Sequence, residues 1–576
     1  MRARTARDGL TVRAIAGTNN VLLAMDLNEA VRRDCLGFSI ERTDVETGDR
    51  RWLPNMVRFP ADQDTKNVTS ARAPIQKFRW GDYTTEPKRR YRYRVVARRG
   101  TSKDILAQGV GAERPNAFDE LPGGVAIEVL TEDCRADRTA IFFNRGAAAS
   151  EAYVRRFGKN DPDKIPEALF WLSRGLNEAV LAFLAAATDK KFVLHAAIYE
   201  FQKDDLVDGL VRAKARGVDV SVVYHARDKG DEDHTKKRNE AAIQKAGIEF
   251  AKPRAAGPSN AIMHNKFVVL LRKTGTGTAK PVAVWTGSTN WTDGAIYGQL
   301  NVGHAVYDAD VAEKYEQYFQ HLHGDLSASA MKDKLATLSP VPHPPTRSAL
   351  VHGTTPIFSP QKDLAMIDLY ADICRQSKLL MVSAPFLLHE KIRATLEAEN
   401  EGTLRFILAD KEGSFGKKGE IEIVQRSNAN KATVATVLKT PLNDFQGRLL
   451  EHTESFHHAG VHLHSKIIAS DPFGLDPVLV TGSANFSNNS TTVNDSNSLI
   501  IRGDTDIMDI YVTEFMRMFE HYWFRFKRSQ KEAEAKAKGQ EVDKVLVLKD
   551  SAEWSDPYYV KGSEEMRDRQ MFAGST

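Results

Sequence analysis

MHNKFVVL at residues 263–270, followed by GSTN at 287–290, recurs as LHSKIIAS at 463–470, followed by GSAN at 482–485. The two motif histidines are 200 residues apart, and the step from histidine to glycine is 23 residues in the first copy and 18 in the second. An apolar, strand-like run precedes the glycine in both copies. This repetition predicts two structural units of the same kind in one chain.

The repeated polar residues are the ones that phosphodiester chemistry needs. They are His264, Lys266, Ser288 and Asn290 in the first copy, and His464, Lys466, Ser483 and Asn485 in the second. Histidine suits both acid and base roles because its unperturbed pKa lies near 6.5. Lysine and asparagine can surround the non-bridging oxygens of a phosphodiester, whose charge otherwise repels nucleophiles. The pattern therefore predicts a paired general acid and base around an anion.

This repeated pattern resembles the motif of the phospholipase D superfamily, which is HxK, four residues, Asp, and then a downstream GSxN. The second copy matches throughout and includes Asp471, whereas the first copy has Leu271 where the family has Asp. The family often has a Glu about fourteen residues after the GSxN glycine. Here those positions hold Asn301 and Ser496, with Asp495 beside the latter. These departures lead us to expect a weaker first half-site.

The resemblance implies an α/β fold with two pseudo-symmetric lobes, each a mixed sheet flanked by helices. His264 and His464 would then face each other across a pseudo-twofold axis between the lobes. One histidine attacks phosphorus to give a phosphohistidine, and the other protonates the leaving alcohol and then activates water or another alcohol. Either can be the nucleophile, although analogy with the family favours His264. Neither a metal nor another cofactor is expected.

The residues expected at the site follow from these motifs. The expected catalytic residues are His264, Lys266, Asn290, His464, Lys466, Asn485 and Asp471, and the expected substrate contacts are Ser288, Ser483 and Trp291. For Asp471 a structural role is the favoured alternative, and Trp291 can equally stack on substrate or pack in the core. We expect His225, His462 and the pair His457–His458 to be ordinary polar residues near the site.

The chain divides into four regions by pattern. Short apolar runs between turn residues predict a small all-β, sandwich-like module over residues 1–118, similar to fibronectin type III or immunoglobulin domains. Alternating strands and helices over 119–345 and 346–528 predict the two lobes, and we assign the strand at 124–130 to the first of them. The Pro-rich stretch 339–345 predicts the linker between lobes. Residues 529–576 are expected to form a charged tail.

The composition is typical of a folded, soluble protein, with 42% hydrophobic and 27% charged residues. The 80 basic and 76 acidic residues give a formal charge of only +4, which argues mildly against a general nuclease. Three distant cysteines, Cys35, Cys134 and Cys374, suggest neither a disulfide framework nor a zinc site. Without a recognisable signal peptide or transmembrane segment, we expect a cytoplasmic protein in which a monomer holds a complete site.

Three functions remain open from the sequence. The first is cleavage of a phospholipid such as phosphatidylcholine or phosphatidylethanolamine to phosphatidic acid and the head-group alcohol. The second is a metal-independent nuclease acting on DNA or RNA through the same intermediate. The third, motivated by the missing Asp and Glu positions, is a weakly active or non-catalytic scaffold that binds a phosphate ligand. The N-terminal module is a possible site for a protein partner.

Overall fold

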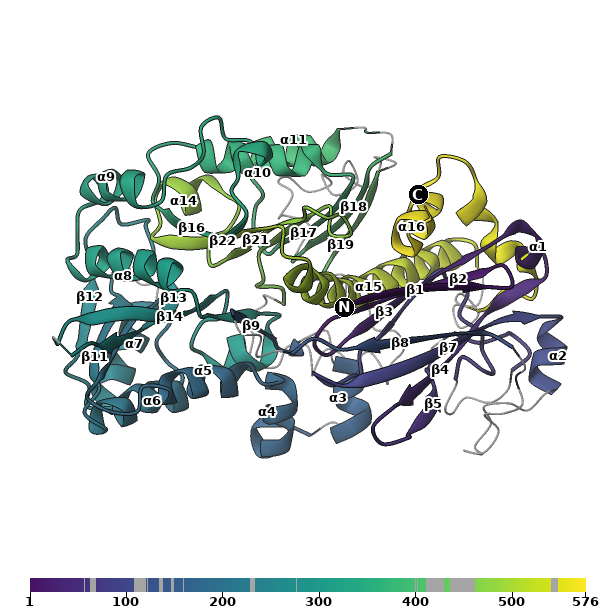
Figure 1. Ribbon diagram of the computed structural model, residues 1–576, viewed down its shortest axis with the longest axis horizontal. Coiled ribbons are helices and arrows are strands. Elements are labelled where there is room, and N and C mark those ends of the chain that lie inside the picture. Colours follow the sequence, from purple (N-terminus) through teal and green to yellow (C-terminus); the bar gives the residue numbers. More distant parts are fainter. Residues whose placement is uncertain are drawn as a thin grey trace.

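The computed structural model shows an α/β protein with two lobes and an all-β module, which confirms the expected fold class (Figure 1). It describes residues 1–55, 57–62, 69–107, 121, 123–133, 138–146, 150–158, 160–227, 234–275, 277–398, 400, 402–410, 429–435, 462–539 and 547–575. The expected boundary at 118/119, Cys134 and the pair His457–His458 lie outside these residues. Among the described strands, two sheets have seven strands and two have four.

The first lobe is a mixed sheet in the order β12-β11-β10-β13-β14-β15-β9. Its strands are β9 (Thr139–Phe143), β10 (Phe192–Ile198), β11 (Asp219–His225), β12 (Ala251–Arg254), β13 (Lys266–Lys273), β14 (Ala279–Gly287) and β15 (Val302–Val306). Strands β10, β11 and β12 are parallel, and the others pair in antiparallel fashion. Helices α5 (Leu176–Ala185) and α6 (Asp204–Ala215) pack on one face, and α8 (Ala309–His323) packs on the other.

The second lobe repeats this topology in the order β19-β18-β17-β20-β21-β22-β16. Its strands are β16 (Gly353–Ser359), β17 (Leu379–Ala384), β18 (Leu404–Ala409), β19 (Asn430–Val434), β20 (Ile467–Ser470), β21 (Val478–Gly482) and β22 (Ser496–Arg502). Helix α10 (Ala365–Gln376) covers one face and α15 (Thr505–Ala537) the other. Each HxK motif thus leads into the same central antiparallel strand, β13 or β20.

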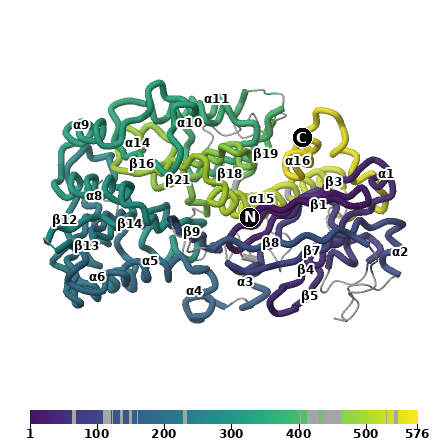
Figure 2. The backbone as a smooth tube through the Cα atoms, in the orientation of Figure 1, coloured from purple at the N-terminus to yellow at the C-terminus, as the bar shows by residue number. Residues whose placement is uncertain are grey.

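One apolar core joins the two lobes. It contains buried residues of α8, of α15 and of both sheets, among them Tyr315, Phe358 and Phe515. Each helix therefore packs its apolar face where the two lobes meet, and Figure 2 shows α15 near the middle of the chain trace and α8 at the left, above the strands of the first lobe. Because burial of apolar surface stabilises this shared core, the lobes are held in one relative orientation.

The N-terminal module consists of two antiparallel sheets, β1-β2-β3-β6 and β5-β4-β7-β8, around one apolar core. Its strands are β1 (Arg2–Arg7), β2 (Leu10–Ala16), β3 (Val21–Leu27), β4 (Cys35–Asp44), β5 (Arg50–Trp52), β6 (Arg79–Asp82), β7 (Arg90–Arg99) and β8 (Val125–Leu130). Assigning the strand at 124–130 to the first lobe was wrong, since β8 pairs with β7. Val125, Ile127 and Val129 are buried while their neighbours are not, as in a sheet with one covered face.

Residues 547–575 pack on the N-terminal module and do not form the expected charged tail. Helix α15 extends the second lobe to Ala537, and the segments η9 (Ala552–Tyr559) and α16 (Glu564–Ala573) return to the N-terminal module. Trp554 is buried in the core of the module and donates a hydrogen bond from Nε1 to the carbonyl of Cys35 at 2.8 Å. Tyr559 donates to the carbonyl of Leu27 at 2.7 Å. Aromatic residues near the end of the sequence were the signal for this packing.

No single helix in the described part of the chain is both long and apolar enough to cross a membrane. Helices α4 (Pro166–Ser173) and α5 together reach that length and composition, but the two are bent by 85° at the break between them.

Replacing Trp554 with Ala tests whether the end of the chain completes the module. We expect the free energy of unfolding to fall by about 3–5 kcal/mol, because a buried indole is removed from a packed core. Urea unfolding followed by fluorescence and circular dichroism measures the change. Leu475→Ala, at a side chain that is 96% exposed, is the control and should shift it by less than about 0.5 kcal/mol. Equal stability of the two variants would contradict the packing described for Trp554.

Candidate active site

The two motif histidines meet at the interface between the lobes. His264 lies two residues before β13 and His464 three residues before β20, and their ring centroids lie 6.1 Å apart at an interplanar angle of 72°. Each side chain comes from a different lobe, and each residue is only 4% exposed. The structure thus brings together the two histidines that the repeat paired.

Each histidine ring is oriented by the opposite lobe. His264 Nδ1 lies 2.9 Å from the carbonyl oxygen of Ser483, and His464 Nδ1 lies 3.0 Å from that of Ser288. Because a carbonyl oxygen only accepts, Nδ1 carries the proton in both rings and Nε2 keeps its lone pair. The GSxN segment of one lobe therefore fixes the tautomer of the histidine in the other.

The glycines of the GSxN motifs are required by the backbone. Gly287 and Gly482 have φ values of 151° and 144°, which favour glycine. A Cβ atom would also collide with the carbonyl oxygen of Val302 at Gly287, and with that of Asn497 at Gly482. These close approaches let the serine carbonyls reach across the interface.

The two motif lysines are buried beside the histidines. Lys266 and Lys466 each donate from Nζ to the carbonyl of the histidine two residues earlier, at 2.6 Å in both cases. Among the residues that the structure describes, no carboxylate forms an ion pair with either lysine. The strand ends thus hold two ammonium groups close to the facing histidines.

Burial shifts the titration of all four basic groups. It lowers the pKa of Lys266 and of Lys466 well below 10.5, and repulsion between the two ammonium groups adds to the effect at Lys266. Burial, followed by the charges of both lysines, likewise lowers the pKa of His264 and His464 well below 6.5. A bound oxyanion would supply the missing negative charge, so the site is suited to an anionic group.

The motif serines brace the backbone. Ser288 Oγ donates to Asn301 Oδ1 at 2.8 Å and accepts from the amide of Val302 at 3.1 Å. Ser483 Oγ lies 3.3 Å from the carbonyl and 3.0 Å from the amide nitrogen of Asn497. The expected contact of these hydroxyls with substrate is therefore replaced by a structural role, while the serine carbonyls orient the histidines.

The motif asparagines keep an unused acceptor. Asn290 Oδ1 and Asn485 Oδ1 are buried without a hydrogen-bond partner among the described residues. Asn290 Nδ2 donates to the carboxylate of Glu200, which the sequence analysis did not single out. Each of these oxygens can therefore accept a hydrogen bond from a ligand hydroxyl or a water molecule, whereas only the amide N–H groups can donate to an anion.

Aromatic side chains that the sequence analysis missed flank the histidines. The ring of Tyr199 lies 5.2 Å from that of His264, and the ring of Phe386 lies 6.2 Å from that of His464. Each ring also lies near the motif lysine of its lobe, at 5.0 Å from Lys266 Nζ and 5.8 Å from Lys466 Nζ. The only available signal was their place just after the buried strands β10 and β17.

Asp471 lies away from the histidines, so listing it as a catalytic residue was wrong. It follows β20, whereas His464 precedes that strand, and seven residues of extended chain span roughly 20 Å. Its carboxylate accepts from the amides of Lys378 at 2.7 Å and Leu379 at 3.1 Å and pairs with Arg347. Leu271 is buried near the corresponding end of β13. Its substitution for Asp therefore removes no group from the first half-site.

Asn301 stands at the sequence position where the family has Glu, and its side chain contacts His464. Its Oδ1 lies 3.0 Å from His464 Nδ1. Ser496, at the equivalent position of the other lobe, has a buried hydroxyl with no partner among the described residues. The neighbouring Asp495 carboxylate instead pairs with Arg227 at 2.8 Å and Arg254 at 3.0 Å.

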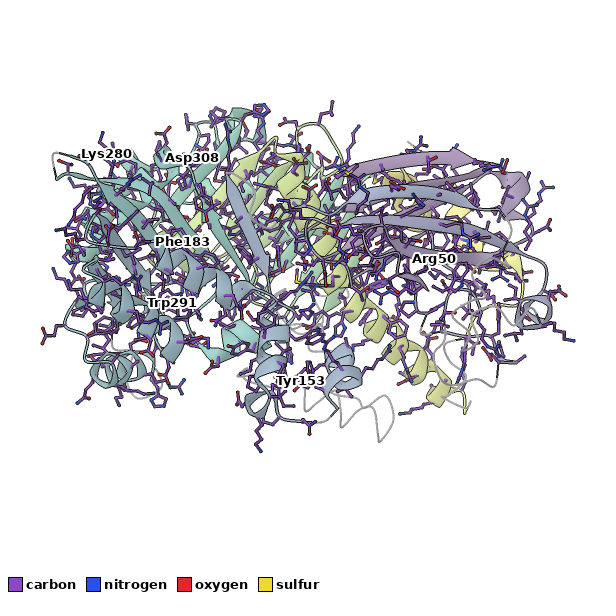
Figure 3. The ribbon with its side chains drawn as sticks, turned by 60° about the horizontal axis from the view of Figure 1, so that its bottom comes forward. Arg50, Tyr153, Phe183, Lys280, Trp291 and Asp308 are labelled. Atoms are coloured by element: carbon purple, nitrogen blue, oxygen red, sulfur yellow. The ribbon has the colours of Figure 1, made fainter. Side chains whose placement is uncertain are left out.

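Trp291 belongs to the core of the first lobe. It is buried and its ring lies 5.8 Å from that of Phe201, which favours the packing alternative over a substrate contact (Figure 3). His225 accepts from the amide of Met263 at 3.2 Å, so it supports the loop before His264. His462 donates from its backbone amide to Asp410 at 2.7 Å. The described residues contain no group of three or more His, Cys, Asp or Glu placed to hold a metal ion.

Comparison with known families decides the kind of domain. Residues 181–323 match the family described as the PLD-like domain of cardiolipin synthase. Residues 181–323 form a phospholipase D-like domain. The matched segment contains the first HxK and GSxN motifs, and the second lobe repeats both the motifs and the sheet order. The matched domain therefore holds His264, and the repeat of its motif in the second lobe holds His464.

Solved structures with some similarity were also found. Phosphatidylserine synthase from Haemophilus influenzae Rd KW20 is 12% identical, with 65% of this chain and 94% of that chain covered and a TM-score of 0.39. Polyphosphate kinase from Porphyromonas gingivalis is 13% identical, with 56% and 42% covered and a TM-score of 0.36, so the chain spans less than half of that kinase. The phospholipase D family member Nuc from Salmonella typhimurium is 25% identical, with 26% and 87% covered and a TM-score of 0.20. No curated protein sequence matched the chain.

An oxyanion such as tungstate should bind this site with uptake of protons. Burial lowers the pKa of these lysines and histidines in the free protein, and a bound anion raises it. The affinity for the anion therefore falls as the pH rises from the pKa of the free protein to that of the complex. Thermal shifts at about pH 6 and about pH 9 measure this, as does calorimetry in buffers of different ionisation enthalpy. Lys466→Met should lose most of the shift, and the exposed Lys334→Met should retain it. Binding that strengthens with rising pH would contradict this assignment.

Asp471→Asn should leave turnover of a phosphodiester within about 2-fold of wild type, because the carboxylate lies at the far end of β20. It should instead lower stability by about 1–3 kcal/mol, since the ion pair with Arg347 is lost. Lys466→Met, tested beside it, should lower kcat about 10²- to 10³-fold. A loss of kcat in Asp471→Asn comparable to that in Lys466→Met, with the fold intact, would restore Asp471 as a catalytic residue.

Proposed function

We propose that this chain hydrolyses phospholipids such as phosphatidylcholine or phosphatidylethanolamine to phosphatidic acid and the head-group alcohol, through a phosphohistidine intermediate. The observation that carries the proposal is the buried pair His264 and His464, whose ring centroids lie 6.1 Å apart. Lys266 and Lys466 are buried beside them. Two histidines with free Nε2 atoms can divide attack and proton transfer between them. The two lysines can neutralise the charge that develops on the phosphoryl oxygens.

The reaction proceeds in two displacements at phosphorus. Nε2 of one histidine forms a bond to phosphorus, while the other histidine donates a proton to the departing alcohol oxygen. The second histidine then removes a proton from water, which attacks phosphorus and breaks the phosphorus–nitrogen bond. Lys266 and Lys466 bind the non-bridging oxygens in both steps, and Asn485 Nδ2 and the second N–H of Asn290 Nδ2 can donate to the same oxygens. Side chains of this protein supply every acid, base and cation in the two displacements, and water is the second nucleophile.

Apolar residues beside His464 support a lipid substrate over a nucleic acid. Phe386 and Leu387 follow β17 and are 36% and 51% exposed. Exposed apolar side chains next to reacting groups suit the acyl part of a lipid. The formal charge of +4 on 576 residues adds no general attraction for a polyanion.

The test is turnover on mixed phospholipid micelles and on plasmid DNA, both in EDTA. Wild type should release the head-group alcohol, and His464→Ala should lower the rate by about 10³-fold or more because a reacting group is lost. His352→Ala is the matched control, since that histidine side chain is 70% exposed and belongs to neither motif. Its rate should equal that of wild type.

Each other result overturns the proposal. DNA nicking that is lost in His464→Ala, without head-group release, would identify a nuclease. No turnover of either substrate by folded wild-type protein would favour a phosphate-binding scaffold. Head-group release that survives in His464→Ala would place the reaction at another site.

A further inference from the structure

The two half-sites hold their histidines differently. His464 Nδ1 has two acceptors, the carbonyl of Ser288 and Oδ1 of Asn301, each at 3.0 Å. Among the described residues, His264 Nδ1 has one acceptor, the carbonyl of Ser483. The difference arises because Ser496 stands where the first lobe has Asn301, and its hydroxyl makes no hydrogen bond to a described residue. A side chain therefore orients only one of the two rings.

The same asymmetry appears just beyond the neighbouring strands. The ladders β10–β13 and β17–β20, continued past the strand ends, set Glu200 opposite His264 and Phe386 opposite His464. Glu200 is bonded to Asn290, so a carboxylate borders the first half-site. Phe386 places the edge of a phenyl ring against His464, at an interplanar angle of 89°. Equivalent positions thus carry an anion in one lobe and an apolar ring in the other.

We propose that His464 is the nucleophile, that Asn301 positions it, and that His264 is the general acid and base. The assignment rests on the proposed phosphodiesterase function and is the reverse of the one that family analogy favours. A ring held by two acceptors keeps its Nε2 directed at phosphorus through both displacements. Such alignment can lower the activation free energy substantially. An amide oxygen on Nδ1–H also stabilises the positive charge that the phosphorylated ring carries.

The surroundings of the two histidines fit these roles. Phe386 covers His464 with apolar surface, which keeps the free ring neutral and limits the access of water to the phosphohistidine. Glu200 borders the side on which the alcohol leaves and water enters, and a carboxylate can accept a hydrogen bond from either. Acyl chains that covered this carboxylate would remove its hydration, so this side is less favourable for the apolar part of the substrate. A substrate therefore binds with its alcohol toward the first lobe and its apolar part toward the second.

In the first step, the lone pair on His464 Nε2 forms a bond to phosphorus and the bond from phosphorus to the alcohol oxygen breaks. The oxygen leaves with the electron pair and takes a proton from His264. In the second step, His264 accepts a proton from water, the water oxygen bonds to phosphorus, and the phosphorus–nitrogen bond returns its electrons to His464. His464 is then neutral, and His264 again carries on Nε2 the proton that it takes up when the anionic substrate binds.

An activated diester separates the two roles experimentally. Bis(p-nitrophenyl) phosphate releases p-nitrophenolate, which needs no proton donor. His264→Asn should therefore complete the first step, releasing one equivalent of p-nitrophenolate per site, and then stall because water is not activated. Its matched counterpart, His464→Asn, should release none. Quenching in alkali followed by proteolysis and mass spectrometry locates the aryl phosphoryl adduct, which we expect on His464.

Three results would overturn the assignment. They are an adduct on His264 in wild type or in His464→Asn, a burst in His464→Asn that is absent in His264→Asn, and turnover without an adduct on either histidine. Because the assay uses a soluble diester, it is independent of the lipid assay. An adduct on His464 with no turnover of phospholipid would disprove the proposed substrate and leave the assignment standing. A wild-type protein inactive toward both substrates would disprove the proposed substrate and the assignment of His464 as nucleophile.

Asn301 is tested by the rate of the burst in the His264→Asn background. Asn301→Ala should slow the burst by about 10- to 100-fold, and Asn301→Asp should retain most of the rate because its oxygen still accepts from Nδ1–H. Ser496→Ala is the matched control in the other lobe and should leave the burst unchanged. Equal effects of Asn301→Asp and Asn301→Ala, or of Ser496→Ala and Asn301→Ala, would reduce Asn301 to a purely structural role.

Discussion

The site depends on two hydrogen bonds that cross between the lobes in opposite directions, from each histidine Nδ1 to the serine carbonyl of the other lobe. Neither lobe can orient its own histidine, so a productive pair of rings exists only when the lobes are docked. The docking is itself specified by buried polar groups. Asn497 accepts from Thr286 at 2.9 Å and donates to Asn265 at 2.8 Å, and α8 and α15 pack around this contact. A buried network of this kind favours one relative orientation of the lobes.

The same interface concentrates positive charge where water is largely excluded. Lys266 and Lys466 are buried with no ion-paired carboxylate among the described residues, which opposes folding, and the apolar core around α8 and α15 offsets that cost. The protonated forms of both lysines and both motif histidines are therefore destabilised in the free protein, and a bound oxyanion would stabilise them. Such local conflict between stability and composition is expected where a site is arranged for a ligand.

The repeated motifs were sufficient to predict the paired lobes and the facing histidines, because a motif at the start of a central strand has a fixed place in the sheet. They could not predict Glu200 or Phe386, whose nearness to the histidines depends on the register of a ladder between distant strands. For Asp471 the motif misled in the other direction. The residue belongs to the motif and was predicted to be catalytic, but it lies at the far end of β20 from His464. Strand β8 and Trp554 were misplaced because their partners are remote in sequence, although the alternation of Val125, Ile127 and Val129 was visible beforehand.

The return of the chain end to the N-terminal module has a consequence for biosynthesis. The amino group of Met1 and the guanidinium of Arg2 pair with Asp509, and Arg569 of α16 pairs with Asp26. Strands β1 to β8 are thus synthesised well before α16, and part of their core stays uncovered until that helix is made. Contacts of such long sequence separation slow folding and prolong the exposure of apolar surface. A chain that stops before η9 and α16 would leave this core open and become a substrate for chaperones and proteases.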